Sequence, residues 1–184
     1  MDEIKFKGPY KFSGKSSIFD EISSVINGVY LWCIKSDNNS FRVYYVGESV
    51  DIKKRMYDHR KNQLEGKYTG HSIDALRKNI RILMHRAGDG MIPRFSKMDR
   101  ASFNKNLTDN LYLFYSELPT TGVKEDDKWL RCRLESGVVF QIENKGQNIV
   151  SVGHLRYWKG KSEEVKVSTG NNIIEALSNE TISI

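Results

Sequence analysis

Two neighbouring stretches of sequence decide the fold: Gly28-Val29-Tyr30-Leu31-Trp32-Cys33-Ile34 and Phe41-Arg42-Val43-Tyr44-Tyr45-Val46. Both are rich in β-branched and aromatic residues, which favour strands. Residues 36–40 between them read Ser-Asp-Asn-Asn-Ser, so the pair predicts a β-hairpin whose loop is slightly longer than the tightest kind. Gly47 ends the second strand, and Asp51 is placed to cap a basic helix over 52–62.

A third strand and two helices complete the predicted core. Residues 111–115 have strand composition, and residues 124–144 have a helical pattern in which Gly137 is the weak point. Ser17 is placed to begin a helix that ends at Asn27, with one apolar face made by Ile18, Ile22, Val25 and Ile26. We therefore predict an α/β (α+β) fold with a small, mostly antiparallel, three-stranded central sheet flanked by helices.

The segment 66–109 is a basic insertion between the predicted second and third strands. Its apolar spacing predicts a helix over 72–86. Basic residues outnumber acidic ones between positions 71 and 105, where Arg77, Lys78, Arg81, Arg86, Arg94, Lys97, Arg100 and Lys105 stand against Asp74, Asp89 and Asp99. Such an excess favours a surface that contacts successive phosphates of a nucleic-acid backbone. The alternative is a solvated helix-loop unit.

We predict a single domain over 1–184, because no internal repeat, low-complexity segment or interdomain linker is visible. Residues 1–27 form an N-terminal arm and helix, with 1–15 as an arm or a short edge element. Residues 28–65 and 110–150 form the core, 66–109 the insertion and 151–184 a C-terminal β extension. We expect strands over 149–158 and 164–167 and a last helical turn over 173–177.

Bulk properties are those of a basic globular protein, with 39% hydrophobic residues, a net charge of +6 and a pI near 9.2. That balance favours polyanionic partners. No apolar run approaches the roughly 20 residues that span a membrane, and the first residues lack the apolar core of a signal peptide, so we expect a cytoplasmic protein. Cys33 and Cys132 have no ligand spacing around them and are expected to be buried thiols.

The hairpin also carries a family resemblance. Gly28-Val29-Tyr30 followed by Tyr45-Val46-Gly47 resembles the paired signature of the GIY-YIG nucleases, with Val in place of Ile in both middle positions. The resemblance continues with Arg55 on the next helix, His59 four residues later and a Glu on a later helix, best matched by Glu135. It covers roughly residues 28–150. The Arg-His pair and the basic insertion make the chain most similar to the stand-alone restriction endonucleases.

The resemblance implies a metal-dependent DNA endonuclease that hydrolyses phosphodiester bonds, of the site-specific restriction type. The alternatives are a non-catalytic nucleic-acid-binding protein on the same scaffold, or a repair or mobile-element nuclease of the same family. In the catalytic reading Tyr30 is the base or positions the water, Tyr45 lies near it, and Arg55 grips the phosphate. A cation beside Tyr30 would lower the pKa of its phenol, and the alternative for both tyrosines is ordinary packing in the core. Palindromic cutting would call for a homodimer.

Glu135 is implied as the sole protein carboxylate on a catalytic Mg²⁺ (or Mn²⁺) ion. Its helical position is in line with Cys132, Val138, Val139 and Ile142, where a carboxylate needs compensation. The alternative compensation is a salt bridge to Arg131 or Arg55.

The remaining site residues leave more alternatives open. The resemblance places His59 near the nucleophile, where it shares in proton transfer, and the alternative is a surface or capping histidine. Asn148 is the best match for an Asn that follows the Glu in this family, with Gln147 and Asn144 as competitors. By strand alternation Tyr44 points to the opposite face from Tyr45. His71, His85 and His154 show no paired ligand spacing and are expected to be structural. The candidates for DNA contact are Lys53, Lys54, Arg60, Arg77, Lys78 and Arg81.

Overall fold

A computed structural model describes residues 3–14, 17–147, 163–170, 173–178 and 180–184. A six-stranded sheet with the order β3-β2-β6-β1-β7-β8 forms the middle layer. Its strands are β1 (Glu3–Lys11), β2 (Gly28–Lys35), β3 (Phe41–Ser49), β6 (Leu111–Glu117), β7 (Glu164–Thr169) and β8 (Glu180–Ser183).

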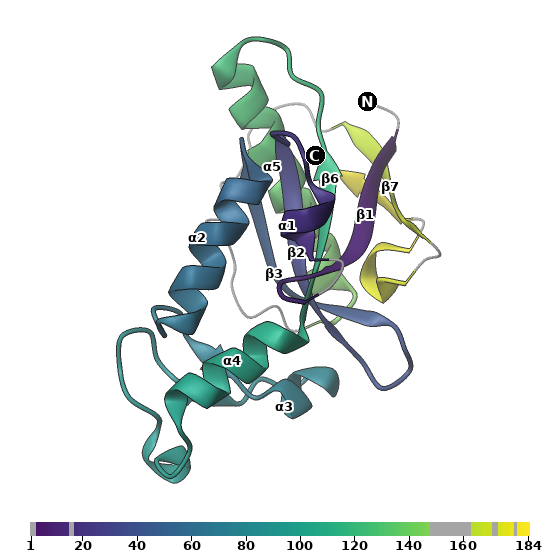
Figure 1. The fold of residues 1–184 in the computed structure, drawn as a ribbon. Helices are drawn as coiled ribbons and strands as arrows, with labels where there is room; N and C mark the ends of the chain where they lie inside the picture. The colour runs from purple at the N-terminus through teal and green to yellow at the C-terminus, as the bar shows by residue number, and fades with distance from the viewer. Residues whose placement is uncertain (1–2, 15–16, 148–162, 171–172, 179) are drawn as a thin grey trace.

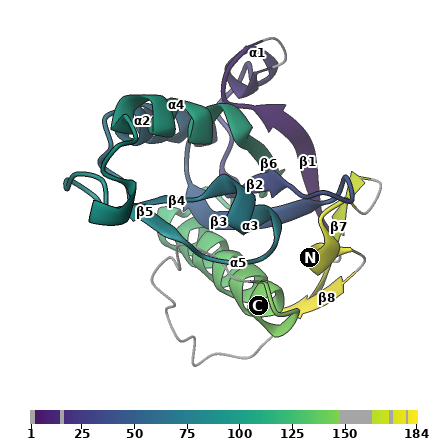
Figure 2. The same ribbon diagram turned by 90° about the horizontal axis from the view of Figure 1, so that it is seen from below.

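Helices cover both faces of this sheet (Figures 1 and 2). One face carries the long helix α5 (Lys124–Asn144) and the 3-10 turn η3 (Glu175–Leu177). The other face carries α1 (Ile18–Glu21), α2 (Ile52–Leu64), α3 (Ile73–Arg77) and α4 (Arg100–Asn110). The predicted mixed α/β class, with a sheet flanked by helices, is confirmed. No helix in the described ranges is long and apolar enough to span a membrane.

The predicted size of the sheet is wrong, since it has six strands rather than three. The three expected strands are present and adjacent, because β2 pairs antiparallel with both β3 and β6. β1 pairs antiparallel with β6 and parallel with β7, so the N-terminal segment lies inside the sheet and is neither an arm nor an edge. Its strand signal is weak because only Ile4 and Phe6 are buried, between exposed charged residues.

The alternation of side chains along β2 divides the apolar residues between two cores. Val29, Leu31 and Cys33 face the core that α5 covers, whereas Tyr30 and Trp32 face the core beneath α2 and α4. All of these side chains are buried, which explains why β2 reads as a continuous apolar run. Cys33 is buried as expected, and Cys132 is only half-buried.

Two predicted helices agree closely with the structure. α5 spans Lys124–Asn144, as predicted, and α2 extends only slightly beyond the predicted end, to Leu64. Asp51 caps α2 as expected, because its carboxylate accepts a hydrogen bond from the Lys54 N–H at 3.0 Å.

The predicted helix from Ser17 to Asn27 is wrong, because α1 ends at Glu21. The chain is extended at Ile22 and then irregular, with a bend at Ser24; Ile22 and Ile26 are buried, whereas Val25 is 71% exposed. The helix ends early because Ser23, Ser24 and their β-branched neighbours have low helix propensity.

The predicted helix over 72–86 is also wrong. α3 covers only Ile73–Arg77, and Asn79 adopts a left-handed conformation with φ of 60°. The Ile80 N–H then donates to the Ala75 carbonyl at 2.9 Å, which is a Schellman-type helix end. The chain continues into β5 (Leu83–His85), which pairs with β4 (Gly70–His71), so the insertion contains β structure as well as helices.

Two further expectations concern the C-terminal segment. β7 (Glu164–Thr169) confirms the strand expected over 164–167, and η3 (Glu175–Leu177) lies within the expected last turn. The strand expected over 149–158 lies outside the described residues.

Candidate active site

Tyr30 is the centre of the candidate site and is fully buried, with 0% of its surface exposed. Its hydroxyl lies 2.7 Å from His59 Nε2, and Arg55 and Tyr45 are close enough to influence its pKa. Gly47 packs directly over it, since a Cβ at this position would lie 2.4 Å from Tyr30 Oη. This close approach requires glycine at position 47, which does not end the strand as predicted, because β3 continues to Ser49.

A β-bulge in β3 places two tyrosines on one face of the sheet. Trp32 is opposite Tyr45 but Cys33 is opposite Val43, so Tyr44 is the extra residue. The prediction that Tyr44 points away from Tyr45 is therefore wrong. Both tyrosines line a cavity of about 480 Å³, where Tyr44 is buried and Tyr45 is half-buried.

His59 is a buried member of this group, so the surface or capping alternative is wrong. It is 3% exposed and lies between two phenols, with Nε2 at 2.7 Å from Tyr30 Oη and Nδ1 at 2.8 Å from Tyr68 Oη. Burial, with the nearby positive charge of Arg55, lowers the pKa of His59 to about 3. The imidazole is therefore neutral at physiological pH and has one donor and one acceptor nitrogen.

Arg55 projects from α2 and is exposed, so its guanidinium is accessible from solvent. Burial opposes its charge, but hydrogen bonding to Tyr30 and the field of the tyrosines raise its pKa above the ordinary value. The expected phenolate at Tyr30 is not supported. Burial raises the pKa of Tyr30 well above 10 and outweighs the hydrogen bond and charge of Arg55, which lower it.

Glu135 approaches the group from α5, which covers the opposite face of the sheet. It is half-buried, and its negative charge reaches Tyr45. Burial raises the pKa of Tyr45, as does the field of Glu135, whereas the Tyr30 hydrogen bond and Arg55 lower it.

The alternative partner predicted for Glu135, Arg131, is engaged elsewhere. Arg131 is 5% exposed, and its Nε donates to Glu48 Oε2 at 2.6 Å. Its Nη1 donates to Asn27 Oδ1, also at 2.6 Å. Arg131 thus neutralises the carboxylate that directly follows Gly47, on the face opposite Tyr30.

Of the three candidates for the site amide, Asn148 lies outside the described residues. Gln147 is buried, and its Oε1 accepts a hydrogen bond from the Val43 N–H at 3.2 Å, which gives it a structural role. Asn144 is exposed at the last position of α5.

The candidates for DNA contact differ in how they are held. Lys54, Lys78 and Arg81 are exposed, whereas Lys53 Nζ donates to the Ile22 carbonyl and Arg60 lies over the Phe19 ring, 5.6 Å from its centroid.

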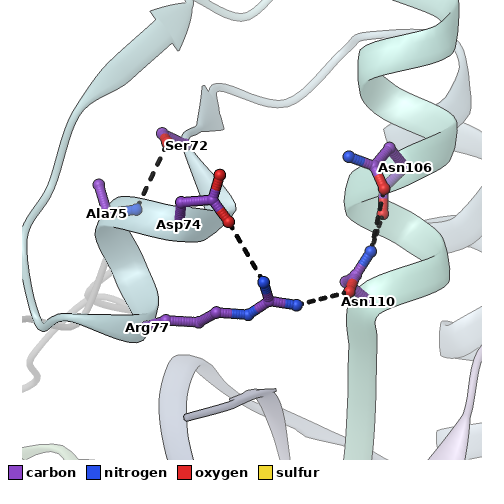
Figure 3. A network of polar contacts seen from close by, with 6 residues as sticks. All are labelled: Ser72, Asp74, Ala75, Arg77, Asn106 and Asn110. Carbon is purple, nitrogen blue, oxygen red and sulfur yellow. Dashed lines mark hydrogen bonds and ion pairs between the residues drawn. The ribbon is translucent and has the colours of Figure 1, made fainter. Parts of the chain in front are cut away.

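Arg77 has a structural role in the insertion, and Figure 3 shows its network. Its guanidinium contacts Asp74 Oδ1 at 3.2 Å and donates to Asn110 Oδ1 at 3.1 Å, while Asn110 Nδ2 donates to the Asn106 carbonyl. Arg77 thereby connects α3 to the end of α4, so its replacement would disturb the insertion as well as remove a charge.

Sequence reasoning missed Tyr68 and Trp32. Tyr68 lies after α2, where it contacts His59 and accepts a hydrogen bond from Asn62 Nδ2 at 3.2 Å. Trp32 lies two residues after Tyr30 and packs edge-on against His59, with ring centroids 4.7 Å apart. Its position at i+2 from Tyr30 is the one signal that indicates it shares the same face.

Among the described residues, the Glu135 carboxylate is the hard ligand that a divalent metal would have beside the tyrosines. Within the described part of the chain there is no cluster of three or more His, Cys, Asp or Glu side chains. A single carboxylate with phosphate oxygens and waters is a donor set that suits Mg²⁺, so the residues fit such an ion.

Comparison with known proteins agrees with this class of site. Residues 26–89 match the family described as the GIY-YIG catalytic domain, a segment that contains Tyr30, Tyr45, Arg55 and His59 and ends before Glu135. No curated protein and no solved structure matches the chain. The match implies a nuclease, that is, a phosphodiester hydrolase, at the level of the family. The match supports the GIY-YIG nuclease superfamily in particular.

Proposed function

We propose that this chain is a divalent-metal-dependent DNA endonuclease that cuts at specific sites, as the restriction branch of the superfamily does. One observation carries the proposal: a neutral His59 and the cation Arg55 both contact the hydroxyl of Tyr30, beside a second, more accessible phenol. If Tyr30 and Tyr45 only packed the core, they would not need a buried imidazole and a guanidinium beside the hydroxyl of Tyr30.

One tautomer of His59 gives its two hydrogen bonds a direction that suits proton transfer. With its proton on Nδ1, His59 donates to Tyr68 Oη and accepts from the Tyr30 hydroxyl through Nε2. Because the proton of Tyr30 is then given to His59, we assign the Tyr45 hydroxyl and Arg55 as donors to Tyr30 Oη. Because Tyr30 is fully buried, we assign contact with the attacking water to Tyr45 and the transfer between Tyr45 and His59 to Tyr30.

In the reaction, a water forms a bond to phosphorus and gives its proton to Tyr45. Tyr45 passes its own proton to Tyr30, and Tyr30 passes its proton to His59 Nε2, while the leaving oxygen departs from phosphorus. A phosphate paired with Arg55 offsets the positive charge that lowers the pKa of His59, so substrate binding makes His59 a better acceptor. Bound at Glu135, a divalent cation would polarise the phosphate and stabilise the departing oxygen.

The first test is nicking of a supercoiled plasmid with and without magnesium. We expect magnesium-dependent conversion to open-circular and linear DNA, with discrete fragments from a larger substrate. DNA binding without any cleavage would instead favour the non-catalytic nucleic-acid-binding alternative. If the site is palindromic, we expect two copies of the chain to act together, which sedimentation with and without DNA would measure.

Replacing Tyr68 by Phe tests the proposed tautomer of His59. The variant leaves buried His59 Nδ1 without the hydroxyl that fixes its proton, so we expect kcat to fall about tenfold with little change in KM. The matched control is Tyr57→Phe, since Tyr57 is 52% exposed on the outer side of α2 and stacks on Phe19. Equal kcat values for the two variants would exclude a positioning role for Tyr68.

Salt dependence tests the DNA-contact surface. We expect the triple variant Lys54→Gln, Lys78→Gln and Arg81→Gln to lower the slope of log K against log salt by about one unit per lost phosphate contact. All three side chains are exposed, and Arg77 is left in place because it has structural partners. The control is Lys166→Gln, which removes an exposed charge from β7. A slope that matches this control would assign the three residues to a solvated surface.

A further inference from the structure

The cavity beside Tyr45 has mainly aromatic walls. It has a volume of about 480 Å³, and Trp32, Tyr44, Tyr68 and His71 line it together with Tyr45. Trp32 lies at the centre of these rings. Its ring centroid is 6.4 Å from that of Tyr44, with the planes only 3° apart, and 5.2 Å from that of Tyr45. Aromatic walls of this kind bind planar rings.

Two of the wall residues hold a buried nitrogen whose hydrogen bonding is incomplete. Trp32 is 3% exposed and His71 is 9% exposed. Within the described ranges, neither Trp32 Nε1 nor His71 Nδ1 has a hydrogen-bond partner. An indole N–H can only donate, and an unpaired buried donor is unfavourable. Both nitrogens have less than 1 Å² of exposed surface, so an acceptor atom of an occupant reaches them once the side chains that cover them move aside.

The same cavity is continuous with the site of the reaction. Arg55 and His59 line it along with Tyr45, so an occupant would lie next to the phosphate that Arg55 holds. The neighbour of that phosphate in a nucleic acid is a nucleoside. Its base is planar and carries carbonyl and ring-nitrogen acceptors, which match the aromatic walls and the indole donor.

We propose that this cavity receives one unpaired nucleobase of the substrate strand, beside the bond that is cleaved. This inference rests on the proposed nuclease function. A base that is stacked and paired within a duplex cannot enter, whereas a base rotated out of the helix or already unpaired can. The tyrosine rings that line the cavity stack on the base, and Trp32 Nε1 donates to one of its acceptors once the side chains that cover this nitrogen move aside.

The first experiment needs no variant. Calorimetry without metal compares the four deoxynucleoside 5′-monophosphates with deoxyribose 5-phosphate, which has the same phosphate and sugar but no base. We expect at least one nucleotide to bind about tenfold more tightly or better, as stacking of one base predicts. The indole N–H resonance of Trp32 should shift on binding. Equal affinity for the nucleotides and the sugar phosphate would overturn the proposal.

A pair of tryptophan variants assigns the binding to this cavity. Trp32→Phe keeps an aromatic ring but removes the N–H, and we expect it to lose about tenfold in nucleotide affinity. Trp129→Phe is the matched control, because Trp129 is 41% exposed on α5. If Trp32→Phe does not fold, the comparison of nucleotides with sugar phosphate in the parent protein, together with the Trp32 resonance, still decides the question.

A cleavage experiment separates failure of this proposal from failure of the proposed function. Duplexes that carry a mismatch next to a mapped cut should be cleaved faster than fully paired duplexes, because the unpairing is already done. A 2-aminopurine placed next to the mapped cut should increase in fluorescence when the protein binds. Cleavage with neither effect would overturn the cavity proposal and leave the nuclease function intact. Base-dependent nucleotide binding without any cleavage would overturn the nuclease function.

Discussion

Tyr30→Phe should reduce single-turnover DNA cleavage by about 10²- to 10⁴-fold, the usual effect of removing an acid-base group. The hydroxyl of Tyr30 is the one atom that connects Tyr45 and Arg55 to His59, so its loss interrupts the transfer of the proton. The phenyl ring that remains should fill the same buried space, and DNA affinity should be unchanged.

Tyr112→Phe is the control for this variant. Tyr112 lies on the neighbouring strand β6 and packs edge-on against Phe41 in the other core, so its hydroxyl is remote from the site. Thermal unfolding of both variants would show whether loss of the Tyr30 hydroxyl affects the fold. A Tyr30→Phe rate close to that of Tyr112→Phe would remove Tyr30 from the reaction.

Glu135→Gln should lower magnesium-dependent cleavage on the order of 10³-fold or more, because the metal supplies several kcal/mol of charge stabilisation. The substitution keeps the shape of the side chain and removes its charge. DNA should bind at least as tightly, since one negative charge beside the phosphate site is lost. We also expect the magnesium concentration needed for residual activity to rise.

The matched control for Glu135→Gln is Glu143→Gln. Glu143 is exposed and lies on the same helix, so this variant has the same change in net charge and a similar helical context. If both variants cleave at the parental rate, Glu135 is not the metal ligand, and Glu117 becomes the next carboxylate to test.

The parts of the fold that were predictable from sequence are those with an unambiguous local pattern. The hairpin of β2 and β3 is bounded by turn formers, and α5 has a long helical periodicity, so both could be placed closely. β1 could not, because its pairing with β6 and β7 depends on residues more than a hundred positions away. The end of α3 depends on the left-handed conformation of Asn79, which apolar spacing does not reveal.

The candidate site was predictable in its residues more than in its electrostatics. Tyr30, Arg55 and His59 do lie together, as the motif and the i, i+4 spacing on α2 indicate. The protonation state of Tyr30 could not be foreseen, because it depends on complete burial beneath Gly47. The bulge at Tyr44 was equally hidden, since one extra residue in a strand changes the face of a side chain without any change in composition.

The position of β1 between β6 and β7 has a consequence for how the chain folds as it is synthesised. Strands β2, β3 and β6 and helix α5 end before residue 147, so the half of the sheet that carries the candidate site can assemble early during synthesis. β1 can join β6 at that time, but its outer edge has no neighbour until β7 emerges. An unpaired strand edge is a template for association with other chains, so the nascent protein is most vulnerable to aggregation during this interval. β7 thus protects the outer edge of β1, although neither β1 nor β7 lies beside the candidate site.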